Sequence, residues 1–240
     1  MTSSKKGKNT PGAKKSGSGV NWTKVAMVVL GVGFVVVMIV TSLGTGWLVG
    51  MKPAQSGDVA VIGLTIRDDL GRAVLTTDER LYTDSIQNGN FIMITGPIQL
   101  IVDGNSSKVV EKIPAYHPSI GNGYFGLYNQ EFNKVSASLV GMKNGETKRI
   151  KFDTYPESLQ NITEEQFNSA GGNFTSVNVN DQLMLSIWDP ESTENTDNTT
   201  PVIPVRIVKI KEKGENYLII DNGYSSADIT IRQLSQASSN

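Results

Sequence analysis

The hydrophobic pattern divides the chain into a short N-terminal part and a long C-terminal part. Residues 25–51 are 27 consecutive positions without a charged side chain. A helix of that length rises roughly 40 Å, at about 1.5 Å per residue, whereas a bilayer's hydrocarbon core is about 30 Å thick. Trp22 and Trp47 stand near its ends, where aromatic rings favour the headgroup region. The pattern predicts one transmembrane helix over residues 25–51.

The alternative for this stretch is a cleaved signal peptide, whose apolar region has about 7 to 15 residues. The stretch here is longer, which favours an uncleaved anchor. The first 24 residues carry six lysines and no acidic residue. Because positive flanks stay on the cytoplasmic side, we expect a single-pass cell-membrane protein with residues 1–24 in the cytoplasm and the C-terminal domain outside. Residues 1–24 read as a disordered basic tail.

Beyond residue 52 the pattern is that of short strands. Residues 59–66 and 73–77 flank a turn-like stretch and predict a hairpin. Residues 129–142 carry Phe132, Val135 and Leu139 on one stripe and predict the main helix. Further strands are expected at 90–96, 98–102, 108–113, 147–152, 177–188, 202–212, 216–221 and 227–234. One main helix with roughly ten strands predicts an α+β fold with an antiparallel sheet.

Charge and composition exclude several classes of function. Beyond Lys24 there are 16 basic residues, 22 less the six in the tail, against 23 acidic ones. An acidic body of this kind argues against a nucleic-acid partner. The chain has no cysteine, which excludes thiol catalysis and thiolate metal sites. The single histidine, His117, cannot form a His-rich metal site, and we expect it at the surface or in a loop.

One short motif is like that of a nucleotide site, and another is that of N-glycosylation. Residues 121–126 read G-x-G-x-x-G, but Pro114 and Pro118 occupy the place of the strand that a nucleotide fold requires, so a turn-rich loop is expected there. Neither a metal nor an organic cofactor is therefore predicted. Four N-x-Ser/Thr sequons follow the predicted transmembrane helix, and they leave glycosylation and chance occurrence as open alternatives: Asn105, Asn161, Asn173 and Asn198.

Residues 131–152, "EFNKVSASLVGMKNGETKRIKF", resemble the core of FKBP-type peptidyl-prolyl isomerases, in which a short helix, a Gly-Met-Lys-x-Gly-Glu turn and a central strand follow one another. Residues 57–77 look like that family's first hairpin. Residues 202–234 are similar to the flap insert and closing strand of SlyD-type and archaeal members. The resemblance covers most of residues 57–236.

This resemblance implies a fold and its domains. It implies an antiparallel sheet wrapped on one main helix, with an FKBP-like domain at 52–153 and 225–236. A β-rich, chaperone-like insert domain is implied at 154–224.

The resemblance also implies where a substrate groove would form. Leu64 takes the place of the family's pocket tyrosine, beside a retained Thr65. Val74 and Leu75 replace a Phe-Asp pair, and Val135 replaces the large aromatic residue on the helix. Tyr155 is the displaced aromatic after the central strand, and whether Tyr155, Tyr124 or Phe125 replaces the missing pocket aromatics stays open.

The expected function follows from these substitutions. The resemblance implies a membrane-anchored, extracytoplasmic peptidyl-prolyl isomerase and chaperone with weak activity, whose partners are unfolded or proline-containing polypeptide segments. The alternative is a non-catalytic surface module of the same scaffold for protein–protein or envelope contacts.

Overall fold

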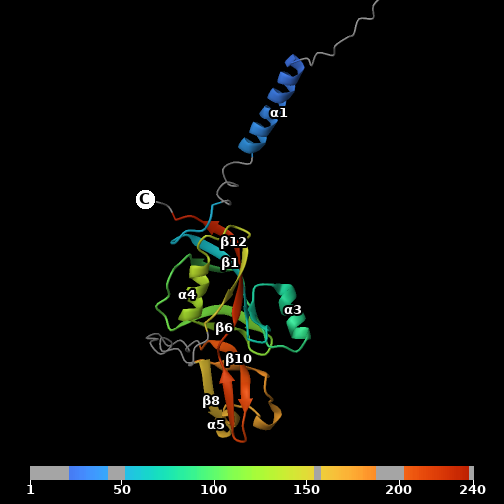
Figure 1. Ribbon diagram of the computed structural model, residues 1–240. Helices are drawn as coiled ribbons and strands as arrows, with labels where there is room; N and C mark the ends of the chain where they lie inside the picture. The colour runs from blue at the N-terminus through green and yellow to red at the C-terminus, as the bar shows by residue number, and fades with distance from the viewer. Residues whose placement is uncertain (1–21, 43–51, 154–157, 188–202, 238–240) are drawn as a thin grey trace, which may run out of the picture. The chain divides into compact units, whose positions relative to one another are not determined.

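The computed structural model describes residues 22–42, 52–153, 158–187 and 203–237 (Figure 1). The chain divides into two compact units, residues 1–47 and residues 48–240, and each is described by itself.

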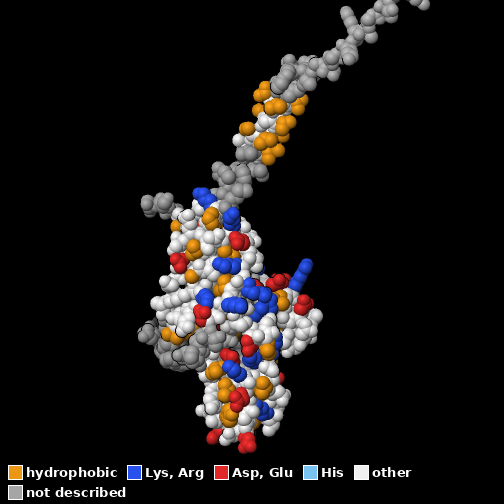
Figure 2. All heavy atoms as spheres, in the orientation of Figure 1, with side chains coloured by type: hydrophobic (Ala, Val, Ile, Leu, Met, Phe, Trp, Pro, Cys, Tyr) orange, Lys and Arg blue, Asp and Glu red, His pale blue; other side chains and the backbone are white. Residues whose placement is uncertain are grey.

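The first unit contains helix α1 (Trp22–Ser42). Its side chains from Met27 to Ile39 are exposed, and Figure 2 shows them as a hydrophobic covering along the helix. The helix begins at Trp22, which polar Thr23 and Lys24 follow, and it ends at Thr41 and Ser42. Its uncharged run between them, Val25–Val40, rises only about 24 Å. In the parts of the chain that the structure describes, no helix is long and apolar enough to cross a membrane. The predicted transmembrane helix at 25–51, and with it the single-pass membrane localisation, is therefore wrong.

The second unit is built on a sheet of twelve strands, counted over its described residues. Along the main path the strand order is β7-β12-β1-β2-β3-β5-β6-β10-β11-β8, while β4 pairs with β1 and β9 pairs with β10. The strands of the first half are β1 (Val59–Arg67), β2 (Ala73–Thr76), β3 (Met93–Ile94), β4 (Ile98–Ile101), β5 (Val110–His117) and β6 (Gly121–Tyr128). Those of the second half are β7 (Thr147–Lys151), β8 (Leu159–Thr163), β9 (Gln182–Ser186), β10 (Val205–Lys213), β11 (Tyr217–Asp221) and β12 (Ser226–Ser235).

Several predicted elements are confirmed. The β1–β2 hairpin pairs in antiparallel fashion, with Thr65 opposite Thr76. The predicted main helix is α4 (Asn129–Ser138), which begins where expected. It is followed by a turn in which Gly141 and Gly145 have φ values of 82° and 80°, a left-handed conformation that favours glycine.

The predicted fold class, an antiparallel sheet on one main helix with a separate β-rich insert, is wrong. The sheet is mixed, because β2 pairs in parallel with β3 and β10 pairs in parallel with β6. The first parallel pair exists because an unpredicted helix, α3 (Glu79–Gln87), carries the chain from β2 to β3. Parallel neighbours need such a crossover, whereas a hairpin turn cannot supply one. The second pair joins the strands of the expected insert to the same sheet.

Two apolar clusters hold this unit together. The larger one lies between the sheet and α4 and includes Ile62, Leu75, Phe125, Val135 and Ile229. The smaller one lies at the other end of the sheet, beneath α5 (Glu164–Ser169) and the 3-10 turn η2 (Phe174–Ser176). It consists of Phe167, Phe174, Val208, Ile210, Leu218 and Ile220.

A buried ion pair fastens β10 to β6 and α4. The Arg206 guanidinium lies 2.8 and 2.9 Å from the two carboxylate oxygens of Glu131, and both side chains are almost fully buried. Arg206 also donates to the carbonyls of Gly126 and Asn222 at 2.9 and 2.6 Å. The Arg206 Cζ atom lies 4.3 and 4.2 Å from the ring centroids of Tyr128 and Tyr224. The guanidinium therefore forms a cation–π contact with each ring.

Candidate functional site

The structure buries the groove residues implied by the sequence. Leu64, Val74, Leu75 and Val135 are each at most 2% exposed and belong to the larger apolar cluster. Tyr155 lies outside the described residues. The four aliphatic residues are thus brought together, but as part of the core and not as the lining of an open groove.

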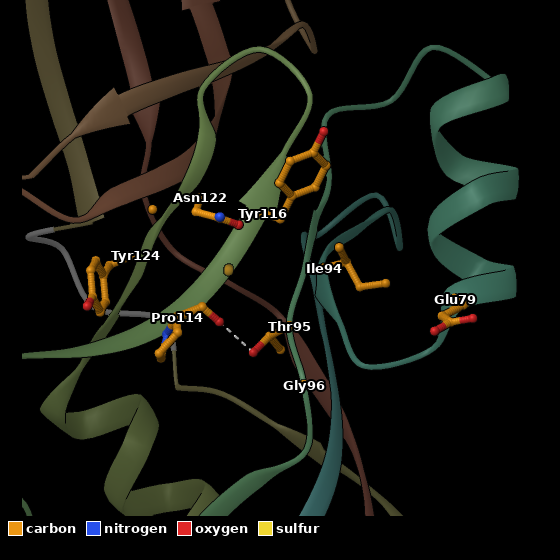
Figure 3. Close-up of a pocket in the computed structure, with 10 residues that line it drawn as sticks. Glu79, Ile94, Thr95, Gly96, Pro114, Tyr116, Asn122 and Tyr124 are labelled. Carbon is orange, nitrogen blue, oxygen red and sulfur yellow. Dashed lines mark hydrogen bonds between the residues drawn. The ribbon is translucent and has the colours of Figure 1, made fainter.

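An open groove lies instead on the β5–β6 hairpin. Alternate residues of a strand point to opposite faces. Ile113, Ala115 and His117 face inward and are buried, whereas Pro114 and Tyr116 are exposed. On β6, Tyr124 lies opposite Pro114 and Asn122 lies opposite Tyr116. The outer face of the hairpin therefore presents a proline, two tyrosines and an asparagine side by side (Figure 3).

Across from the hairpin runs the segment from Ile94 to Pro97. Thr95 Oγ1 donates a hydrogen bond of 2.7 Å to the Pro114 carbonyl, which holds this segment against β5 (Figure 3). One hollow, of about 530 Å³, lies on the Ile94, Tyr116 and Tyr124 side of this contact. A second hollow, of about 390 Å³, lies between β4 and the first half of β5, where Phe132 of α4 contributes to its lining.

Thr95, Gly96 and Pro114 line both hollows, which together form what we call the Pro114 groove. The volume of each hollow falls in the range of about 300–1,000 Å³ that is usual for ligand sites. The apolar side chains of Ile94, Ile98, Pro114 and Phe132 line the groove together with neutral polar residues and a few charged ones, which are Glu79, Glu111 and Lys112. Such a surface suits an extended chain of mixed side chains more than a small charged ligand.

The groove exists because β5 is paired along only one edge. Toward β6, all eight residues of β5 are in register, from Val110 opposite Tyr128 to His117 opposite Gly121. Toward β3, the described pairing is limited to Tyr116 opposite Ile94. After β3 the chain turns away from β5, and β4 pairs with β1, where Ile98 lies opposite Ile62. Pro114 fits this open edge, because proline has no N–H to donate.

Helix α3 forms the third side of the groove through its first residue, Glu79 (Figure 3). The Tyr82 hydroxyl of the same helix is buried and has no hydrogen-bond partner among the described residues. Its burial, and secondarily the nearby Tyr116, raises the pKa of Tyr82 above its ordinary value. Tyr82 is therefore neutral at physiological pH.

His117 ends β5 and is buried, so the expectation of a surface or loop position is wrong. Its ring stacks on Phe91 with centroids 5.6 Å apart, and its Nδ1 accepts a hydrogen bond of 3.1 Å from the Ser119 amide. Burial lowers the pKa of His117 below its ordinary value. The ring is a neutral packing element that anchors the end of the hairpin.

The sequence contained only weak signs of this site. Residues 121–126 were expected to form a turn-rich loop, but they form most of β6, so that prediction is wrong. Tyr124, one of three aromatic residues left open as pocket replacements, lies in the groove, whereas Phe125 is fully buried. Pro114, Tyr116 and Glu79 were missed, and a proline two residues before a tyrosine, in a strand-like stretch, was the one local sign of an open strand edge.

The described structure shows no group of acidic or histidine side chains that could hold a metal ion. Among the sequons, Asn105, Asn161 and Asn173 are exposed. Asn198 lies outside the described residues, and whether any of the four carries a glycan stays untested.

No family model matches the chain, and no curated protein matches it.

Proposed function

We propose that this protein is a folding helper that binds extended, proline-containing polypeptide segments in the Pro114 groove and speeds cis–trans exchange of the bound X–Pro bond. The observation that carries the proposal is the open edge of β5, which borders a groove lined by Ile94, Pro114, Tyr116 and Tyr124. Aromatic and proline side chains pack well on a proline ring without an ionised partner.

Isomerisation of an X–Pro bond requires few chemical groups from the protein. An X–Pro bond rotates over a barrier of about 18–20 kcal/mol because of amide resonance, and uncatalysed exchange takes tens to hundreds of seconds. No nucleophile or metal is required. A groove that removes water from the amide favours the twisted transition state, in which resonance and the amide dipole are reduced. Residues 131–152, which resemble FKBP-type isomerases, support the isomerase part of the proposal.

The test is a proline-limited refolding assay with the purified chain at micromolar concentration, run beside an assay of client aggregation. We expect faster refolding and less aggregation. The matched variant is Gly96→Leu, because a Cβ at Gly96 has no heavy atom within 4 Å and the new side chain fills the groove without disturbing the core. Gly33→Leu, at an equally open glycine in α1, is the control and should leave both activities unchanged.

An unchanged refolding rate together with unchanged aggregation would refute the folding-helper function. Equal activity of Gly96→Leu and the natural sequence would show that the groove has no part in this function.

A second candidate is a non-catalytic module that binds polypeptides in the same groove. It is favoured by the burial of Leu64, Val74, Leu75 and Val135, since these positions then supply no enclosed pocket for a proline ring. The two candidates differ in one measurement. The module reduces aggregation but leaves the proline-limited rate unchanged, whereas the isomerase alters both.

A further inference from the structure

The larger hollow of the Pro114 groove contains a single charged residue. Of the ten residues that line it, nine are apolar or neutral polar, and the tenth is Glu79. Its carboxylate stands at the rim, on the side opposite the β5–β6 hairpin (Figure 3). A lone charge beside a largely apolar surface biases which charged side chains a bound segment can place there.

The Glu79 carboxylate has no ion-pair or hydrogen-bond partner among the residues that the structure describes. The acid in the smaller hollow differs in this respect. Glu111 accepts a hydrogen bond from Ser106, and Lys108 Nζ lies 3.9 Å from its other oxygen. Glu111 is thus neutralised from within the protein, whereas Glu79 presents its charge to whatever occupies the groove.

The position of Glu79 is fixed by the start of α3. Asp78 caps this helix, and its Oδ1 accepts hydrogen bonds from the amides of Arg80 and Leu81 at 2.9 and 3.2 Å. Glu79 is the first residue after the cap and lies within the turn that these two hydrogen bonds close.

We propose that Glu79 gives the groove a preference for segments that carry a lysine or arginine close to the proline. This inference rests on the proposed function, since it names the class of segment that the same groove takes. Because the carboxylate is exposed, the effect corresponds to a surface ion pair, about a two- to fivefold gain in affinity at low salt. Salt reduces it through screening.

The experiment uses the full chain and three fluorescent peptides that share a central Leu-Pro-Phe and differ only in one flanking residue on each side: lysine, glutamine or glutamate. Fluorescence anisotropy gives each Kd at low and at high salt. The lysine peptide should bind about two- to fivefold more tightly than the glutamine peptide at low salt, and the glutamate peptide more weakly. At high salt the Kd values of the three peptides should become similar.

Glu79→Gln should abolish this difference between the peptides. Glu79→Lys should reverse the order. Glu165→Gln is the matched control, because Glu165 is also an exposed glutamate in the first turn of a helix but does not line the groove.

A preference for lysine that survives in Glu79→Gln would overturn the role of this residue while leaving the proposed function intact. Equal binding of the three peptides by the natural sequence would do the same. Absence of binding by all three would overturn the proposed function and this inference with it.

Discussion

His117, the only histidine of the chain, is held neutral by its surroundings. It is 4% exposed, stacked on Phe91, and hydrogen-bonded through an acceptor nitrogen to the Ser119 amide. Protonation would place a buried charge there and remove that acceptor. The folded protein therefore binds a proton at His117 less readily than the unfolded chain does.

We expect stability to depend on pH through this one group. Burial lowers the folded-state pKa of His117 below 6.5, so its contribution is fully present above about pH 6.5. It is lost as the pH falls below that value toward the folded pKa, because the unfolded state takes up the proton first. Urea unfolding between pH 8 and 5 measures the effect. His117→Asn, which keeps an acceptor near Nδ1, should show a flatter profile over this range, and identical profiles would contradict the explanation.

At the scale of secondary-structure elements, the Arg206–Glu131 pair is the main polar contact between β10, β6 and α4. Replacing Arg206 by Met should lower the free energy of unfolding by about 3–5 kcal/mol, because Glu131 then stays buried without this cation. The double variant Arg206→Met, Glu131→Leu should recover much of the loss, since an apolar pair avoids the desolvation of both charges.

Chemical denaturation of the natural sequence, the single variant and the double variant tests this, with Arg149→Met as control. Arg149 pairs with Asp228 at an exposed position, so its loss should cost much less stability than the loss of Arg206. A double variant no more stable than Arg206→Met alone would contradict the account.

The elements also show which structural features can be predicted from sequence. The β1–β2 hairpin and α4 were predictable because their periodicity is local and their turns have glycine at positions with positive φ. Helix α3 was missed although Asp78 is a good cap, because its nine residues contain few apolar ones to form a stripe. Without α3 there is no crossover, and the parallel pairing of β2 with β3 could not be foreseen.

The groove could not be predicted for a similar reason. It depends on which edge of β5 lacks a partner, and strand pairing is a property of residues far apart in the chain. A resemblance based on residues 131–152 indicates a local turn, but it does not determine how Leu64 or Val135 packs. Both proved to be core residues.

At the scale of the whole molecule, the second unit contains two apolar clusters that share one sheet but no residue. The smaller cluster depends on Phe167, whose ring lies over Gly172, where a Cβ would come within 2.5 Å of it. Clusters separated in this way commonly open independently.

Phe167→Ala should therefore act locally. We expect a loss of about 3–5 kcal/mol in the stability of the smaller cluster, typical for removal of a buried aromatic ring. Amide hydrogen exchange should accelerate in β8, β9 and β11 and change little in β1 and β12. Uniform acceleration across all strands would show that the sheet opens as one cooperative unit.

The proline at the centre of the groove has a consequence for aggregation. An exposed strand edge normally offers alternating donors and acceptors on which other chains can assemble into fibrils. Pro114 interrupts that row on β5, since it lacks the N–H and its carbonyl is already occupied by Thr95. The open edge of β5 is therefore a poor template for amyloid-like growth, although it lacks a full partner strand.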